Sequence, residues 1–249
     1  MKPIHFKNPK GFTLLETVIA IGVLAVLLSG FLVVFAPAAA GIRLSINTQA
    51  ADRLASALET ELAKIRPTEP GLPSGSSTSF DKAFDWIRRS NTSNGKLAGA
   101  EPIFVYQYRG EATGTLRPDG TRNPVIKIEG KFVGKDYVIV PMARRLSDTL
   151  FSDDLRAIEG AVYLVKAKQL VSGGGGVTFG RGGEIKNSEG VTVTNATSYP
   201  EAALAFAAEF HLMPSKDLGY FRGTGANAPF PLKFESRTPV FTRNIAVRR

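Results

Sequence analysis

The first part of the chain is an apolar stretch of membrane length. No charged residue occurs from Thr17 to Ile42. The segment Thr17 to Ala36 holds 20 residues, and at about 1.5 Å per residue a helix over it spans about 30 Å, one hydrocarbon core. The pattern predicts a transmembrane helix. Pro37 has no amide donor and predicts a kink or an end of this first helical section.

An amphipathic pattern follows Pro37. Apolar residues recur at steps of four or three, which is the spacing of one helix face; they are Ile46, Ala50, Leu54, Leu58, Leu62 and Ile65. Charged residues such as Arg53 and Glu59 take the other side, and Pro67 and Pro70 stop the helix. We expect residues 12–65 to form one long helix whose second half packs on a sheet.

The rest of the chain alternates short apolar runs with glycine-rich turns, which is typical of strands. The strands expected are 102–108, 125–128, 131–133, 137–140, 161–170, 191–194 and 240–247. A hairpin is expected around Gly134 and Lys135, and another whose tip lies in the glycine-rich run 173–183. Helices are expected at 80–90 and 200–211, with a helical turn at 153–159. The fold class is therefore α+β: a long N-terminal helix on an antiparallel β-sheet head domain.

A carboxylate lies at the start of the apolar helix. Glu16 precedes the uncharged run directly, and Lys2, Lys7 and Lys10 precede Glu16. A charge at the membrane core costs several kcal/mol by insertion scales, so an intramembrane acid is a functional-site hypothesis by default. The lysines indicate that the segment before the helix stays in the cytoplasm and that the rest of the chain lies on the far side of the membrane.

The run Lys10-Gly11-Phe12-Thr13-Leu14-Leu15-Glu16 resembles the class III signal of type IV prepilins and pseudopilins. The resemblance is specific over about the first 55 residues. It implies that a prepilin peptidase cuts after Gly11 and that the new N-terminal residue, Phe12, is N-methylated. It also implies that Glu16 pairs with the free amine of Phe12 on a neighbouring subunit during filament assembly.

The resemblance implies a domain organisation and a set of partners. Residues 1–11 are the leader, 12–41 the transmembrane and assembly helix, 42–66 the amphipathic stalk helix, and 67–249 the head. The expected location is the inner membrane, with the N-terminus cytoplasmic and the head periplasmic or extracellular, and then a type IV pilus or a type II secretion-like pseudopilus. The expected partners are the prepilin peptidase, other subunits, the inner-membrane assembly platform and lipid.

Two other interpretations of the N-terminus remain open. Ala38-Ala39-Ala40 offers a signal peptidase site, and cleavage after Ala40 would release a secreted soluble binding protein. The apolar run is longer than the 7 to 15 residues of an ordinary signal peptide, which counts against this alternative. The second is a plain signal anchor, in which Glu16 only lies at the membrane interface.

The amino-acid composition excludes several kinds of site. There is no cysteine, which excludes disulfides, thiol nucleophiles and Cys-based zinc sites. The net charge of +9 favours DNA or anionic surfaces, but the arginines are scattered, which indicates an ordinary basic surface; only this charge supports a role in DNA uptake.

The sequence assigns no catalytic residue, cofactor or metal. The glycine-rich run lacks the Gly-Lys-Ser/Thr ending of a phosphate loop. His211 is expected to be an ordinary histidine of a helix. The spacing of Asp148, Asp153 and Asp154 matches no calcium loop and indicates an exposed helix N-cap. We therefore expect a structural subunit rather than an enzyme.

Overall fold

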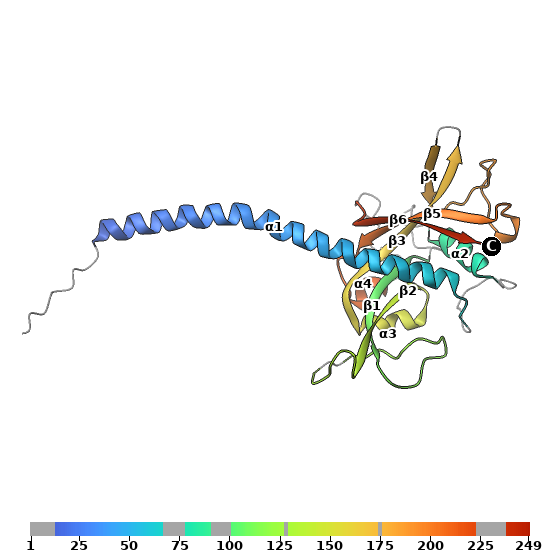
Figure 1. The fold of residues 1–249 in the computed structure, drawn as a ribbon, viewed down its shortest axis with the longest axis horizontal. Coiled ribbons are helices and arrows are strands. Elements are labelled where there is room, and N and C mark those ends of the chain that lie inside the picture. Colours follow the sequence, from blue (N-terminus) through green and yellow to red (C-terminus); the bar gives the residue numbers. More distant parts are fainter. Residues whose placement is uncertain (1–12, 67–77, 91–100, 127–128, 174–175, 223–237) are drawn as a thin grey trace, which may run out of the picture. The chain divides into compact units, whose positions relative to one another are not determined.

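The computed structural model describes residues 13–66, 78–90, 101–126, 129–173, 176–222 and 238–249 (Figure 1). The chain forms two compact units, residues 1–46 and residues 47–249. Helix α1 (Leu14–Ala63) runs through the boundary between them. The expectation of one long helix over 12–65 is confirmed for Leu14–Ala63, whereas Thr13, Lys64 and Ile65 lie outside the helix.

The first unit contains the apolar half of α1. Its large apolar side chains from Leu14 to Phe35 are between 53% and 85% exposed. Pro37 lies inside the helix, which does not end there, because a single missing amide removes one hydrogen bond while the turns on both sides remain. A kink at Pro37 stays a prediction.

The second unit begins with the amphipathic half of α1. The predicted apolar face is confirmed at its centre, where Leu54, Leu58 and Leu62 are at most 1% exposed. Ile46 and Ile65, at the two ends of the predicted face, are exposed. The centre of the stripe packs into the core of the second unit, as predicted, and its ends do not.

One antiparallel sheet forms the centre of the second unit. Its strands are β1 (Ile103–Glu111), β2 (Tyr137–Arg145), β3 (Ile158–Gly173), β4 (Gly176–Gly182), β5 (Ala203–Leu212) and β6 (Phe241–Arg248). The order is β2-β1-β3-β5-β6, and β4 pairs with the second half of β3. The curled sheet and the long helix packed against it confirm the predicted α+β class (Figure 1).

The two faces of the sheet carry two cores, because successive strand residues point to opposite sides. Ile103 and Val105 point toward α1 and α2 (Ser79–Arg89), whereas Phe104 and Tyr106 point toward the opposite core. That opposite core is closed by α3 (Thr149–Leu155) and α4 (Leu218–Arg222). A short 3-10 helix, η1 (Ala196–Ser198), adds Ala196 to the first core.

Several predicted elements are confirmed. Helix α2 starts with a capping box, in which Thr78 and Asp81 each accept a hydrogen bond from the other's backbone amide. Such a reciprocal cap satisfies two amides that the first turn leaves free. The strands expected at 102–108, 161–170 and 240–247 correspond to β1, β3 and β6, and the glycine-rich run forms a hairpin of β3 and β4.

The helix predicted at 200–211 is wrong: this segment forms strand β5, the central partner of β3 and β6. The prediction used the spacing of Leu204, Ala208 and Leu212, but a step of four is even and fits a strand face as well as a helix face. Phe206 and Phe210 complete the alternation, and each is at most 1% exposed. Burial of this alternating face outweighed the helix propensity of the alanines.

Other predicted elements are shifted or absent. Residues 131–133 form no strand and no hairpin around Gly134 and Lys135, since the partner of β2 is β1. Residues 125–126 form no strand, and 191–194 contain only an isolated bridge from Thr192 to Lys186; residues 127–128 lie outside the described residues. The turn expected at 153–159 is a helix four residues earlier, and β3 begins at Ile158.

Candidate functional site

The candidate assembly site begins at the first turn of α1. Thr13 Oγ1 accepts a hydrogen bond from the amide of Glu16 at 3.2 Å, and Glu16 Oε2 accepts from the amide of Thr13 at 2.9 Å. The Thr13 hydroxyl also donates to Glu16 Oε2 at 3.0 Å. These contacts form a capping box, so the carboxylate is held at the N-terminal end of the helix.

This local role of Glu16 was missed by the sequence analysis. The signal was present as Thr13-x-x-Glu16, because a threonine followed three residues later by glutamate is the pattern of a capping box. The cap satisfies one oxygen of the carboxylate from within the same chain. Glu16 Oε1 makes no hydrogen bond among the described residues of the helix start, so the carboxylate retains capacity for a further donor.

The apolar surface next to Glu16 is long enough to cross a membrane. By length and composition, α1 is the single helix with this property among the described residues. None of the 18-residue window with this hydropathy is buried, and the window lies near the N-terminus. Gly11 and Phe12, the predicted cleavage and methylation residues, lie outside the described residues.

The aspartates considered for calcium are placed differently from the prediction. Asp148 is an N-cap, as expected, and accepts from the amide of Leu150 at 2.9 Å. Asp153 is exposed, but Asp154 is fully buried and is not part of an exposed cap. No group of three or more metal-ligating side chains occurs in the described part of the chain.

Asp154 is the centre of a buried ionic network. Its Oδ1 accepts from Arg117 at 2.8 Å, and its Oδ2 accepts from Arg144 at 2.9 Å and from the Tyr106 hydroxyl at 2.7 Å. Arg144 also donates to Asp119 at 2.9 Å. Burial, together with the neighbouring carboxylate, raises the pKa of Tyr106 well above its ordinary value, so the phenol remains a donor. The network joins the long β1–β2 connection, which carries Arg117 and Asp119, to α3 and β2.

A second buried network lies at the end of α1. Glu61 accepts hydrogen bonds from Lys82 of α2 at 2.8 Å and from Arg66. Lys82 also donates to the carbonyl of Lys64 at 2.7 Å, and Arg66 donates to the carbonyl of Asp119 at 2.9 Å. The last turn of α1 is therefore joined to α2 and to the β1–β2 connection by charged groups that the sequence pattern did not reveal.

His211 lies in a strand rather than in the predicted helix. It is 4% exposed, and neither ring nitrogen makes a hydrogen bond among the described residues. Its Nε2 lies 3.7 Å from Glu209, which pairs with Lys168 at 2.6 Å. No nucleophile is within hydrogen-bond reach of the ring in this part of the chain, so His211 has no partner for general base chemistry.

The position of His211 predicts a pH dependence of stability. Burial lowers the pKa of His211; the negative charge of Glu209 acts against this shift, and the positive charge of Lys166 adds to it. The unfolded chain then binds the proton more tightly, so the free energy of unfolding falls as the pH drops below about 6.5, by at most about 1.4 kcal/mol per pH unit. We expect His211→Leu to flatten this slope between about pH 6.5 and 5.5. Denaturant unfolding at several pH values, followed by the fluorescence of Trp86, the single tryptophan, measures this slope. An unchanged slope in the variant would contradict the assignment of the pH dependence to His211.

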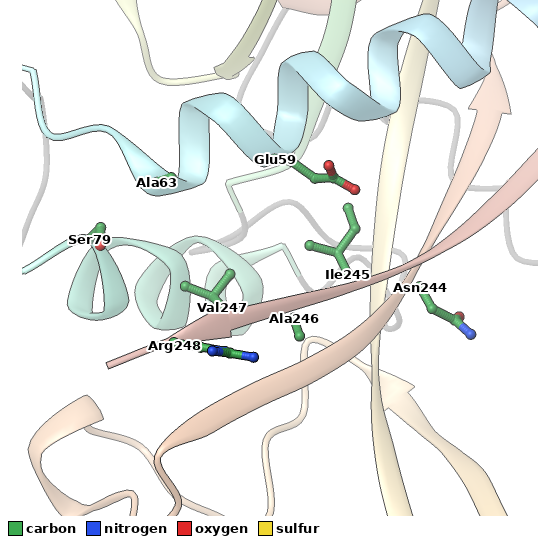
Figure 2. Close-up of a pocket in the computed structure, with 8 residues that line it drawn as sticks. All are labelled: Glu59, Ala63, Ser79, Asn244, Ile245, Ala246, Val247 and Arg248. Atoms are coloured by element: carbon green, nitrogen blue, oxygen red, sulfur yellow. The ribbon is translucent and has the colours of Figure 1, made fainter.

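Two surface grooves flank α1 within the second unit. The one in Figure 2, of about 360 Å³, lies between α1, the start of α2 and strand β6, and Glu59, Ser79 and Arg248 are among its lining residues. Glu59 is paired there with Arg243 at 2.9 Å. The other lies between α1 and β2. Hydroxyl and carboxylate side chains line both grooves, but among the described residues no hydrogen bond joins a lining hydroxyl to a lining carboxylate or amine, so neither groove shows the nucleophile–base pair of an active site.

Comparison with known proteins identifies the N-terminal segment. Residues 6–32 match the prokaryotic N-terminal methylation motif. No curated protein and no solved structure matches the chain. The match spans Gly11, Phe12 and the capping box of Glu16, together with most of the apolar half of α1.

The chain thus carries the N-terminal motif that is typical of type IV pilins and pseudopilins. The long helix packed on an antiparallel sheet is a pilin-like architecture, in agreement with that motif. The motif implies a pilin-like subunit that is processed by prepilin peptidase and assembles with other subunits. It points to a structural protein, not an enzyme.

Proposed function

We propose that this chain is the precursor of a filament subunit that is anchored in the inner membrane, cleaved after Gly11 and polymerised through its N-terminal helix. The observation that supports it most strongly is the position of Glu16. This acid lies at the start of an apolar helical segment of membrane length whose large side chains are exposed, inside the segment that matches the methylation motif.

The proposed mechanism is electrostatic pairing at low dielectric. A lone carboxylate at the edge of the hydrocarbon is costly, and Thr13 satisfies only part of it. In the assembled filament, the amine of Phe12 from a neighbouring subunit supplies the opposite charge. The pairing fixes the axial register between two helices, and the exposed apolar faces from Leu14 to Phe35 then bury one another as the subunit leaves the bilayer.

The proposed organisation follows from this mechanism. Residues 1–11 are the cytoplasmic leader, residues 12–41 the assembly helix, residues 42–66 the stalk, and residues 67–249 the head on the far side of the membrane. The two compact units support a division between an assembly part and a head, although the boundary between them lies at residues 46 and 47. The assembly platform of the inner membrane is the further partner proposed.

The destination proposed is a type IV pilus or a type II secretion-like pseudopilus. The head contains no cysteine and so has no disulfide-closed loop. Together with its size, this favours a pseudopilin-type or minor subunit over a major adhesive pilin. A gene neighbourhood with a prepilin peptidase, an assembly ATPase and a secretin distinguishes a secretion system from a retractable pilus.

Substitution of Gly11 tests the processing step. We expect Gly11→Val to leave a full-length precursor in the membrane, because a branched side chain obstructs a cleavage site that takes a small residue. Leu15→Val, four residues along, is the matched control and should be processed normally. Mass spectrometry of the N-terminal peptide gives the result. A normal N-terminus at Phe12 in the Gly11 variant would refute processing at this site.

A further inference from the structure

Two clusters of exposed apolar side chains lie on the head. The β4 cluster consists of Val177 and Phe179, each 64% exposed. The turn cluster consists of Phe132 and Val133, which are 67% and 63% exposed and lie in the turn before β2. Exposed apolar side chains that gather in one place commonly mark a contact with another molecule.

The β4 cluster is carried by a hairpin that extends beyond the rest of the sheet. Pairing between β3 and β5 ends at Gln169, and β3 continues to Gly173 with β4 alone as its partner (Figure 1). Val177 and Phe179 are two residues apart, so they point to the same side. The outer edge of β4 pairs with no other strand among the described elements.

The turn cluster is held in place by hydrogen bonds of its own loop. The amide of Phe132 donates to Asp136 Oδ2 at 2.8 Å, the amide of Asp136 donates back to Phe132 O at 2.9 Å, and Gly134 donates to Tyr137 O at 2.7 Å. Gly134 has a φ of +83°, which favours glycine. Because the turn is already ordered, a partner does not have to supply the ordering free energy.

The two clusters lie at opposite ends of the sheet. Strands β2 and β3 are both antiparallel to β1, so they run in the same direction. The turn cluster precedes the start of β2, which pairs with the end of β1 at Glu111. The β4 cluster lies beyond the opposite end of β1, where Ile103 pairs with Val165. Figure 1 shows the β4 hairpin and the β1–β2 connection on opposite sides of the head.

We propose that the β4 cluster of one subunit docks on the turn cluster of the next copy of this chain. Two different patches at opposite ends of a molecule make a heterologous contact, and such contacts generate open polymers rather than closed dimers. The inference rests on the proposed function, in which copies of the chain are stacked in a filament. It adds a head contact to the contact between N-terminal helices.

The charges favour a second copy over DNA or anionic lipid as the occupant. Without the leader lysines Lys2, Lys7 and Lys10, the net charge of +9 falls to +6, so the basic surfaces of two copies repel each other. The turn is an exception, since Glu129 and Asp136 balance Lys131 and Lys135. Arg181, which is exposed at the end of β4, matches the exposed carboxylate of Glu129.

The size of the contact determines when it forms. Four apolar side chains bury much less than the roughly 1,200–2,000 Å² of a stable pair in solution. The contact therefore forms between subunits that their N-terminal helices already hold together, where the effective concentration is high.

Disulfide trapping tests this contact, because the chain contains no cysteine. The double variant Val133→Cys/Phe179→Cys is produced as the full chain, and its sheared filaments are oxidised. We expect a ladder of dimers, trimers and higher oligomers on non-reducing gels. Each single variant alone should give no ladder, and the two single variants produced together should give dimers only. The matched control is Val133→Cys/Val191→Cys, since Val191 is 57% exposed and belongs to neither cluster; its ladder should be absent.

Filament yield is scored separately in the wild type. If filaments form but the Val133/Phe179 cysteine pair gives no more disulfide-linked oligomers than the control pair, the proposed head contact is wrong. The proposed function is then unaffected. Dimers from either single variant alone, at the level of the mixture, also overturn it, because they indicate a symmetric contact. Absence of filaments from the wild type overturns both proposals.

Discussion

Glu16→Val is expected to abolish incorporation of the subunit into filaments while leaving the membrane pool of the protein unchanged. The variant makes the apolar helix more hydrophobic, so insertion should not fall. Cleavage should persist, because Gly11 and the basic leader are intact. Removal of one partner of a buried charge pair typically costs about 3–5 kcal/mol, which corresponds to a loss of more than about 100-fold in incorporation. Co-purification of tagged subunits with sheared filaments measures this incorporation.

Two further variants separate charge from local structure at this position. Glu16→Gln keeps an oxygen that accepts from the Thr13 amide, since glutamine also forms capping boxes, but it has no charge. We expect it to fail like Glu16→Val. Thr17→Val, the next residue, removes the hydroxyl that donates to Thr13 O at 3.2 Å and leaves every charge in place; it should assemble normally. Assembly of both Glu16 variants at wild-type level would remove Glu16 from the mechanism.

The largest expected effect on head stability is at Asp154. Asp154→Ala leaves Arg144 and Arg117 without their shared buried carboxylate. We expect a loss of about 3–5 kcal/mol in the free energy of unfolding, because the buried Arg117 loses its carboxylate partner while Arg144 keeps Asp119 and Asp148. For a domain of this size the loss corresponds to a fall of roughly 10 °C in melting temperature. The fluorescence of Trp86, which is 3% exposed, reports unfolding of the head alone.

The neighbouring aspartate supplies the matched control. Asp153→Ala removes the same charge from an exposed position of the same helix, and its effect should be within about 0.5 kcal/mol of zero. Equal melting temperatures for the two alanine variants would show that the ionic network contributes nothing specific to the stability of the head.

The features of the N-terminal segment could be predicted from the sequence because their signals are local. An uncharged run, a basic leader and an acid at a given distance from Gly11 are all read along one segment. The same holds for the apolar stripe at Leu54, Leu58 and Leu62, whose spacing reports one helix face. The capping box of Thr13 and Glu16 is a local signal of the same kind, since Thr13-x-x-Glu16 lies within one helical turn.

The buried contacts of the head could not be predicted from the sequence, because the residues that make them are brought together only by folding. Asp154 is more than thirty residues away along the chain from both Arg117 and Tyr106, and no periodicity marks them as neighbours. Strand β5 was predicted as a helix since Leu204, Ala208 and Leu212 satisfy both periods. This segment forms a strand because it pairs with β3 and β6, and a local sequence pattern does not report such long-range pairing.

The mass of the mature N-terminal peptide from the native host tests the central claim most directly. If the chain is a filament subunit processed through its methylation motif, the mature protein begins at Phe12 and carries one methyl group on its amine. A mature protein that begins at Gly41 would instead identify a secreted protein released by signal peptidase, and one that retains the leader up to Gly11 would identify a plain membrane anchor. Either of these two results contradicts the account.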